Sequence, residues 1–156
     1  MSENENTGTE QEQNTSTVTE TTGSTSILNQ AIEAVMDLID ALSLFATITR
    51  GALGTEESLT CEIGPSSPEI ICLDKEQYFP IDLTINGKNK NLQTLSDSMN
   101  LIHERLTMMF EYPSGDNWKI TDIGTMTAPQ IIGREQDNRW MMASSLSVKI
   151  YMMKGE

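Results

Sequence analysis

The fold is decided by residues 79–110, which read FPIDLTINGKNKNLQTLSDSMNLIHERLTMMF. The beginning of this stretch alternates between apolar and polar side chains, and this period of two is typical of a strand with one buried face. The pair Asn86-Gly87 is a strong turn signal and predicts that the strand ends there. Pro80 cannot donate a backbone hydrogen bond, so it favours an edge position or an irregular start of the strand.

The same stretch continues with a helical period. Apolar residues recur three and four positions apart, which predicts an amphipathic helix from about Leu92 to Phe110. Upstream, the same spacing from Leu28 to about Thr49, preceded by possible capping residues at 24–26, predicts a first helix. The strands predicted around the two helices lie at residues 59–63, 69–73, 118–123, 128–133 and 146–152, with a turn at 133–138.

This order of helix, strands, helix and strands predicts the α+β class, with two amphipathic helices packed on a mostly antiparallel β-sheet. We expect residues 27–156 to form one such domain, because their number suits a single core. Residues 1–26 contain one large aliphatic residue, Val18, after the initiator methionine. Such a segment cannot bury enough apolar surface to offset the entropy of ordering it, so it is predicted to be a disordered acidic tail.

The chain is strongly acidic, with 23 Asp and Glu residues against 10 Lys and Arg and a net charge of −13. A basic surface for nucleic acid is therefore not expected, and sequence-specific DNA binding and binding to an anionic membrane are both disfavoured. The simplest explanation of the acidic balance is solubility. The sequence predicts no signal peptide, and its most apolar stretch, residues 41–49, is too short to span a membrane.

The side chains that carry chemistry are few and scattered. His103 is the only histidine, and its place beside Glu104 in the second helix favours a partly exposed residue over a ligand. Cys61 and Cys72 have a spacing and surroundings typical of buried thiols, although a disulfide between two adjacent strands remains an alternative. Common nucleotide-binding, hydrolase and metalloprotease motifs are absent. We therefore predict no catalytic residue, no metal, no cofactor and a protein that is not an enzyme.

Two features predict contacts with other protein subunits. Three methionine pairs occur, at 108–109, 141–142 and 152–153, and neighbouring residues of a strand point to opposite faces, so one member of each strand pair can face outward. Residues 133–140 form either a solvated hairpin loop anchored by Trp140 or a loop that pairs with a neighbouring subunit. The predicted interface residues are Arg134, Glu135, Arg139, Trp140, Tyr151 and Met153.

Several segments resemble, in their order and amino-acid sequence, those of a known protein family. The segments are the strand and helix of residues 79–110, Trp118-Lys119-Ile120, Thr127-Ala128-Pro129, Gly133-Arg134-Glu135, Arg139-Trp140 and an alternating final strand. Over residues 27–154 the chain resembles the tail-terminator and minor capsid proteins of long-tailed, siphovirus-like bacteriophages of Gram-positive bacteria. The acidic tail has no counterpart in this resemblance.

The resemblance implies an α+β subunit that assembles as a homo-oligomeric ring, expected to be a hexamer. This ring would end polymerisation of the tail tube and join the tail to the head connector or head-completion protein. DNA would pass through it, and an acidic surface suits that passage. The expected location is the tail or neck of the virion, after assembly in the host bacterial cytoplasm. The alternatives are another neck or head-completion protein and, from a different class, a soluble binding module with the tail as its linker.

Overall fold

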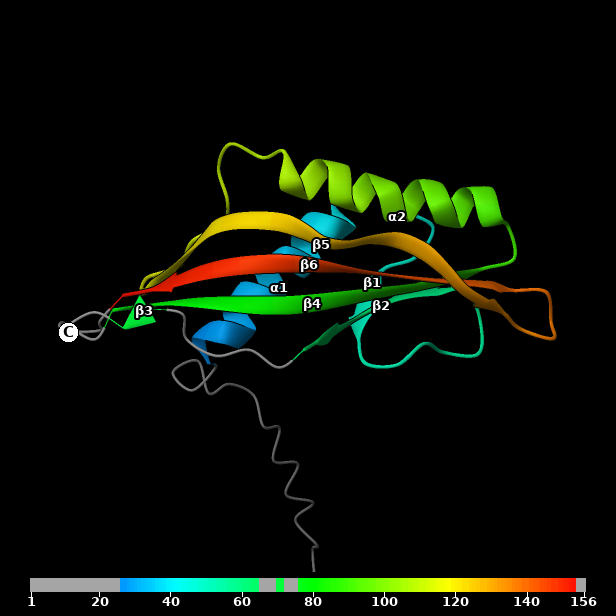
Figure 1. Cartoon of the computed structure of the whole chain (residues 1–156), viewed down its shortest axis with the longest axis horizontal. Helices are drawn as coiled ribbons and strands as arrows, with labels where there is room; N and C mark the ends of the chain where they lie inside the picture. Colours follow the sequence, from blue (N-terminus) through cyan, green and yellow to red (C-terminus); the bar gives the residue numbers. More distant parts are fainter. Residues whose placement is uncertain (1–25, 65–69, 72–75, 154–156) are drawn as a thin grey trace, which may run out of the picture.

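The computed structural model describes residues 26–64, 70–71 and 76–153, which form two helices and six strands (Figure 1). In chain order they are α1 (Ile27–Asp40), β1 (Ile48–Arg50), β2 (Ser58–Ile63), β3 (Ile70–Ile71), β4 (Gln77–Asn89), α2 (Leu92–Thr107), β5 (Trp118–Arg134) and β6 (Trp140–Met152). Three predictions fall on residues outside the described ranges: the tail up to residue 25, the ends of the strand at 69–73, and the pairing of Cys72.

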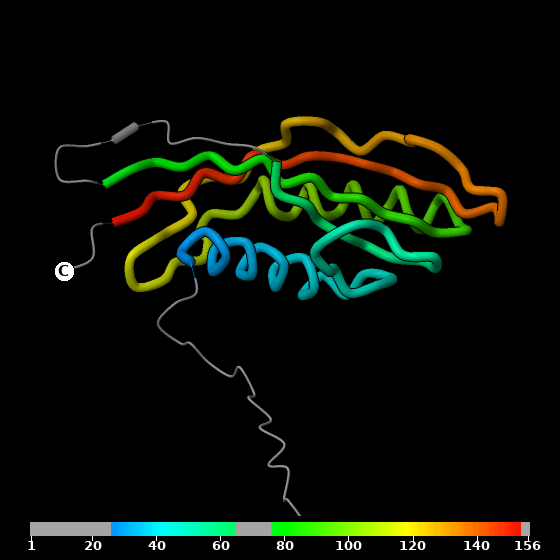
Figure 2. The backbone as a smooth tube through the Cα atoms, turned by 90° about the horizontal axis from the view of Figure 1, so that it is seen from below, coloured from blue at the N-terminus to red at the C-terminus, as the bar shows by residue number. Residues whose placement is uncertain are grey.

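The strands form one sheet in the order β1-β2-β4-β6-β5, and β3 pairs with β4 off this path. The β1–β2 pair is parallel and the other pairs are antiparallel. Both helices lie on the same side of the sheet (Figure 2), where α2 contacts β4, β5 and β6 and α1 contacts β1, β5 and β6. The predicted α+β fold, with two helices on a mostly antiparallel sheet, is confirmed.

The core lies between the two central strands and the two helices. β4 and β6 pair along their whole length of 13 residues, and alternate residues of each point toward the helices. The buried side chains of this layer include Ile81, Leu83, Ile85, Leu146, Val148 and Ile150 from the sheet and Ile32, Val35, Ile39, Leu95, Met99, Ile102 and Leu106 from the helices. Burial of each such side chain stabilises the fold by about 1.5–3 kcal/mol.

The turn predicted at Asn86-Gly87 is wrong, because β4 continues through both residues to Asn89. Gly87 serves the contact between the strand and α2: a Cβ at this position would lie 2.6 Å from Cδ1 of Leu95. The glycine therefore permits a close approach of helix to sheet. The chain turns only at Asn91, whose side chain accepts a hydrogen bond from the backbone N–H of Thr94 at 3.1 Å and caps α2.

Both helices are shorter than predicted. Ser26 caps α1, as the sequence indicated, but α1 ends at Asp40 and not near Thr49. Ser43 has a φ of 54°, which breaks the helical path, and Oδ1 of Asp40 accepts a hydrogen bond from Ile48 N at 2.9 Å. This bond holds Ile48, the first residue of β1, against the end of α1. α2 ends at Thr107, three residues before the predicted Phe110.

Pro80 lies in the central strand β4, yet its surroundings resemble an edge. β2 pairs with β4 as far as Leu83, and β3 pairs with Tyr78 and Gln77, so Pro80 lies between these two ladders on that flank. The missing N–H therefore interrupts neither of them. The predicted edge position or irregular start is nevertheless wrong, because β4 is a central strand and Pro80 pairs in continuous register with Lys149 of β6.

The strands predicted at 118–123 and 128–133 are parts of one long edge strand, β5. Its pairing with β6 shifts register at four places between Ile120 and Gly133. Each shift inserts extra residues and turns the following side chains to a new direction. This irregularity explains why the sequence pattern of β5 looked like two short strands.

The prediction of a partly exposed His103 is wrong, since only 6% of the residue is exposed. Its Nδ1 lies 2.9 Å from Oγ1 of Thr125, which joins α2 to β5. Its Nε2 is buried and has no hydrogen-bond partner among the described residues. Burial lowers the pKa of His103 below its ordinary value, because the imidazolium would lose its hydration.

We expect the free energy of unfolding to fall as the pH drops through about 6.5, because the unfolded chain then binds a proton at His103 that the folded chain does not. The loss should continue until the lowered pKa of the folded state is reached. The variant His103→Gln lacks this component. Chemical denaturation of both proteins from about pH 8 to pH 5 measures it: their difference should be constant above pH 6.5 and change below it. A difference that is constant throughout would contradict the assignment.

Candidate subunit interface

The β5–β6 hairpin contains four of the six predicted interface residues. It turns at residues 135–138, where Asn138 has a φ of 69° and Glu135 N donates to Arg139 O at 2.8 Å. Arg134 and Trp140 face each other across the base of the turn, and the guanidinium carbon lies 4.8 Å from the centre of the indole ring. This cation–π contact agrees with the prediction that Trp140 anchors the hairpin.

The hairpin is tied to the rest of the chain by a buried lysine. Lys88, near the end of β4, has a side chain that is only 4% exposed, and its Nζ lies 2.6 Å from Oε1 of Glu135. The same ammonium donates to the carbonyl of Gly54 at 2.8 Å. Because a buried ammonium needs its partners to offset lost hydration, Lys88 holds both the hairpin and the loop after β1 in place.

Arg139 makes a second connection to the same loop. Its Nη1 donates to the carbonyl of Thr55 at 3.1 Å, and the guanidinium also pairs with Asp137 inside the turn. Glu135 and Arg139 thus contact residues of their own chain. Their role here is to fix the shape of the hairpin, and the exposed parts of Arg134 and Glu135 are what the hairpin offers to a partner.

Tyr151 and Met153 lie at the opposite end of β6 from the hairpin. The ring of Tyr151 lies 4.9 Å from that of Tyr78, and Lys119 Nζ lies 5.4 Å from its centre. Its hydroxyl donates to Glu76, and Met153 N donates to the carbonyl of Asn117 at 2.8 Å. The structure therefore divides the six predicted residues between two ends of one strand, about 35 Å apart at the rise of a strand.

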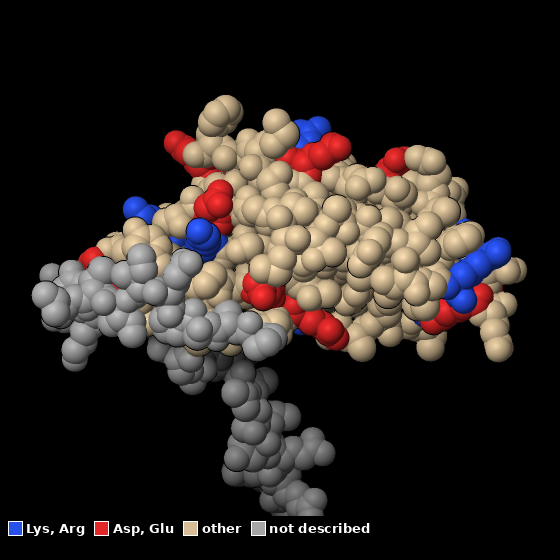
Figure 3. All heavy atoms as spheres, in the orientation of Figure 1, with Lys and Arg blue, Asp and Glu red and all other residues tan. Residues whose placement is uncertain are grey.

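Between these ends, the face of the sheet away from the helices carries small or uncharged polar side chains. They include Thr84, Asn86, Ala143, Ser145 and Ser147, from facing positions of β4 and β6, and toward the Tyr151 end the same face also carries the charged Asp82 and Lys149. Figure 3 shows this face, with a broad central area free of charged side chains and most charges near its margins. Its uncharged central part would lose less hydration than a charged surface when another protein covers it.

The exposed apolar residues of β5 and of the chain after α2 were not predicted from the sequence. Met126, Ile131 and Ile132 are between 51% and 53% exposed, and Phe110 is fully exposed. One signal was available: Ile131 and Ile132 are neighbours in a strand and cannot both face the core. Of the two methionine pairs at β6, the prediction of one inward and one outward side chain holds for Met141 and Met142, since Met142 is buried and Met141 is more exposed, whereas Met152 and Met153 are both half-buried.

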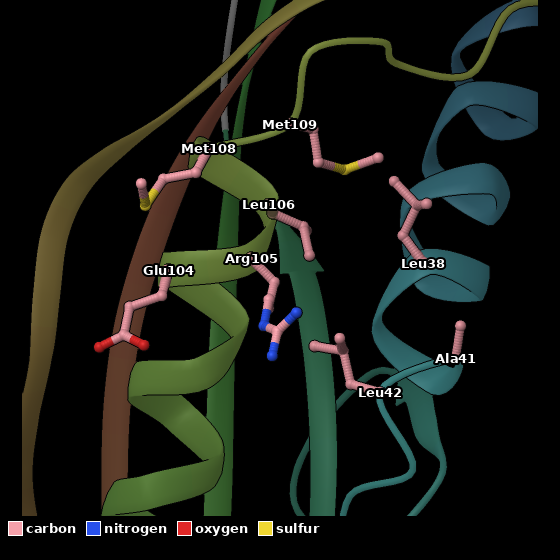
Figure 4. Close-up of a pocket in the computed structure, with 8 residues that line it drawn as sticks. All are labelled: Leu38, Ala41, Leu42, Glu104, Arg105, Leu106, Met108 and Met109. Atoms are coloured by element: carbon pink, nitrogen blue, oxygen red, sulfur yellow. The ribbon is translucent and has the colours of Figure 1, made fainter.

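A hollow lies on the helix side of the molecule, between the C-terminal parts of α1 and α2 (Figure 4). Its volume is about 590 Å³. Met109 and Leu38 point toward one another across it, and Arg105 reaches from α2 toward Leu42. The lining residues are Leu38, Ala41, Leu42, Glu104, Arg105, Leu106, Met108 and Met109. The lining is mostly apolar and contains no Ser, Thr, Cys, His or Lys.

The remaining chemistry of the described residues is sparse. They include no group of three or more His, Cys, Asp or Glu side chains placed to hold a metal ion. Cys61 is buried as predicted, and burial raises the pKa of its thiol, which makes it a poor nucleophile. Within the described ranges, neither helix has the length and apolar character needed to cross a membrane.

The fold of this chain is similar to that of a protein chain of known structure. The sequence matches no protein-family model and no curated protein. Among solved structures, its fold is similar to a chain of the virion of a native gene transfer agent particle, with a TM-score of 0.57. The match covers 81% of this chain and 99% of that chain at 10% sequence identity. The likeness concerns the fold, which both chains share over nearly the whole length of the virion chain.

The buried ion pair of the hairpin gives a direct test of its geometry. We expect Glu135→Gln to lower the free energy of unfolding by about 1–3 kcal/mol, because it leaves the buried Lys88 ammonium without a carboxylate. The double variant Glu135→Gln with Lys88→Met should lose less of its free energy of unfolding than the single variant, since it contains no unpaired buried charge. Urea denaturation measures all three proteins, and Asp122→Asn, an exposed acid of β5, is the matched control. Equal losses in the single and double variants would show that the pair is not formed.

Proposed function

We propose that this chain is a structural protein of a phage-like virion. We propose further that it forms a homo-oligomeric ring that ends the tail tube and joins it to the head connector. The observation that carries the first part is the similarity of its fold to nearly the whole of a chain from a gene transfer agent virion. The second part rests on the resemblance of residues 27–154 to tail-terminator proteins and on the surfaces described above.

The surfaces of the chain support a role in assembly. The sheet has one face without a described helix, and its edge strand β5 exposes Met126, Ile131 and Ile132. Exposed apolar side chains on a small protein are typical of contact surfaces. A contact between different patches of identical subunits closes into a ring when its rotation permits. The proposed partners are therefore other copies of this chain, the tail tube protein and the head connector.

The predicted interface residues enter this proposal as two separate groups. Arg134, Glu135, Arg139 and Trp140 form a hairpin fixed by internal contacts, so a partner would meet it with little loss of conformational entropy. Tyr151 and Met153 lie at the other end of β6 and would meet a different partner or a different copy. A subunit of a ring at the end of a tube needs contacts with neighbouring copies in the ring and contacts with the proteins above and below it.

The charge of the chain suits a passage for DNA. With a net charge of −13, a ring of these subunits would repel the phosphate backbone and let it pass without sticking. No sequence-specific contact with nucleic acid and no cofactor is needed for this role. The virion, after assembly in the bacterial cytoplasm, is the corresponding location.

Two other functions share parts of this support. A different neck or head-completion protein would have the same kind of partners at a different position in the virion. A soluble binding module would use the exposed residues of β5 for an unrelated partner and would stay monomeric. The fold shared with a virion chain favours the first of these over the second.

Electron microscopy of particles made without this protein separates the three functions. For a tail terminator we expect tails that are longer than normal or not joined to heads, because nothing stops polymerisation of the tube. Particles complemented with the wild-type gene are the control. Normal tails beside unjoined heads would point to head completion, and normal particles would contradict any structural role in the virion.

A further inference from the structure

The hollow between α1 and α2 has the character of a binding site for aliphatic side chains. Leu38 and Leu42 are only half-buried although they adjoin the core, and Met109 across the hollow is also half-buried, so part of their apolar surface is left in water. The volume of about 590 Å³ falls in the range of about 300–1,000 Å³ that holds groups of drug size. Several aliphatic side chains from another protein segment would fit into it.

The same chain presents a segment that matches this hollow. Met126, Ile131 and Ile132 of β5 are each about half exposed, and Ile131 and Ile132 lie at a register shift that turns the strand. This segment lies toward the hairpin end of the molecule, whereas α2 ends toward the other end (Figure 1). One subunit therefore cannot fill its own hollow with its own β5.

We propose that the hollow of one subunit binds Ile131 and Ile132 of the next subunit in the ring. This inference rests on the proposed assembly of the chain and names the surfaces that carry it. Filling the hollow would remove apolar surface of both subunits from water, which supplies the main favourable term of association.

The charges at the rims of the two surfaces are complementary. Glu104 and Arg105 are exposed at the edge of the hollow. Arg134, which is exposed, lies two residues after Ile132 in the chain. Glu104 at the rim of the hollow can therefore meet Arg134 of the neighbour, whereas Glu135 pairs with Lys88 of its own chain. Such pairs at a rim contribute orientation more than affinity.

The edge of β5 favours contact through side chains over pairing of strands. An added strand needs a regular row of free N–H and C=O groups, and β5 is interrupted by four register shifts and by Pro129. The same shifts direct apolar side chains outward. Hollow and strand are different patches, so a contact that two subunits do not make reciprocally is heterologous, and its repetition generates a ring or a filament.

Cysteine cross-linking tests the contact directly. The variant carries Leu42→Cys and Ile131→Cys together with Cys72→Ser, and Cys61 stays because it is buried. Mild oxidation of the full-length chain, alone and bound to tail tubes, should give a ladder of covalent oligomers on a denaturing gel. Each single cysteine variant should give at most a dimer, because one cysteine can join only two chains. A double variant that gives dimers alone overturns the proposal.

Equilibrium sedimentation gives an independent measure. We expect Leu42→Glu and Ile132→Glu each to raise the dissociation constant of the assembly by about 30-fold. Asn100→Glu, an exposed position of α2 outside the hollow, makes the same change of charge and should leave it unchanged. Circular dichroism confirms that each variant is folded before the comparison.

The possible outcomes separate this inference from the proposed function. If the wild-type chain assembles but neither variant weakens it and no ladder forms, the contact is wrong and the virion role stands. If deletion of residues 1–25 weakens assembly while Ile132→Glu does not, those residues occupy the hollow and the contact is again wrong. A wild-type chain that stays monomeric alone and with tail tubes overturns both.

Discussion

The pairing of β4 with β6 is the interaction on which the rest of the molecule depends. These strands run side by side for 13 residues, and their alternating side chains give the sheet one apolar face and one polar face. Both helices lie on the apolar face and bury it, and within the described residues nothing comparable covers the other. A sheet covered on one side is stable as a single domain and still has a whole face and an edge strand available to partners.

The features that fix the hairpin follow from the same pairing. β6 continues past the core to Trp140, so its partner β5 must continue to Arg134, and the turn between them would be a loose arm without further support. Lys88 supplies that support from the end of β4 through Glu135 and the carbonyl of Gly54. The result is a rigid projection at one end of the subunit and an apolar hollow on its helix side, which are the parts that a repeating assembly requires.

The sequence predicted those parts of the fold that a simple period encodes. The predicted strands at 79–85 and 146–152 and the two predicted helices were correct. Each was inferred from a period that reports one buried face. Gly87 misled because a glycine after asparagine signals a turn, whereas here it makes room for Leu95. The end of α1 was missed because it depends on a hydrogen bond from Ile48 to Asp40, a contact across a turn that no local pattern reveals. The burial of His103 depends on β5, which is distant in sequence.

For the candidate interface, residue type indicated the hairpin but not the direction of its side chains. The charges of Glu135 and Arg139 suggested partners in another subunit, and the structure gives them partners in their own chain. Ile131 and Ile132 belong to a predicted strand, and the sequence did not show that they are exposed. An apolar residue of a strand is exposed where no helix covers it, and this depends on where the helices end.

The central claim is that this chain is a ring subunit at the junction of tail and head. Electron cryomicroscopy of intact particles tests it most directly, by fitting the subunit into density at the end of the tail tube. The account predicts a ring of identical copies there, each with its central sheet resolved and its β5–β6 hairpin against the next copy. A junction in which every density is explained by other chains, or a particle that lacks this chain, would contradict the account.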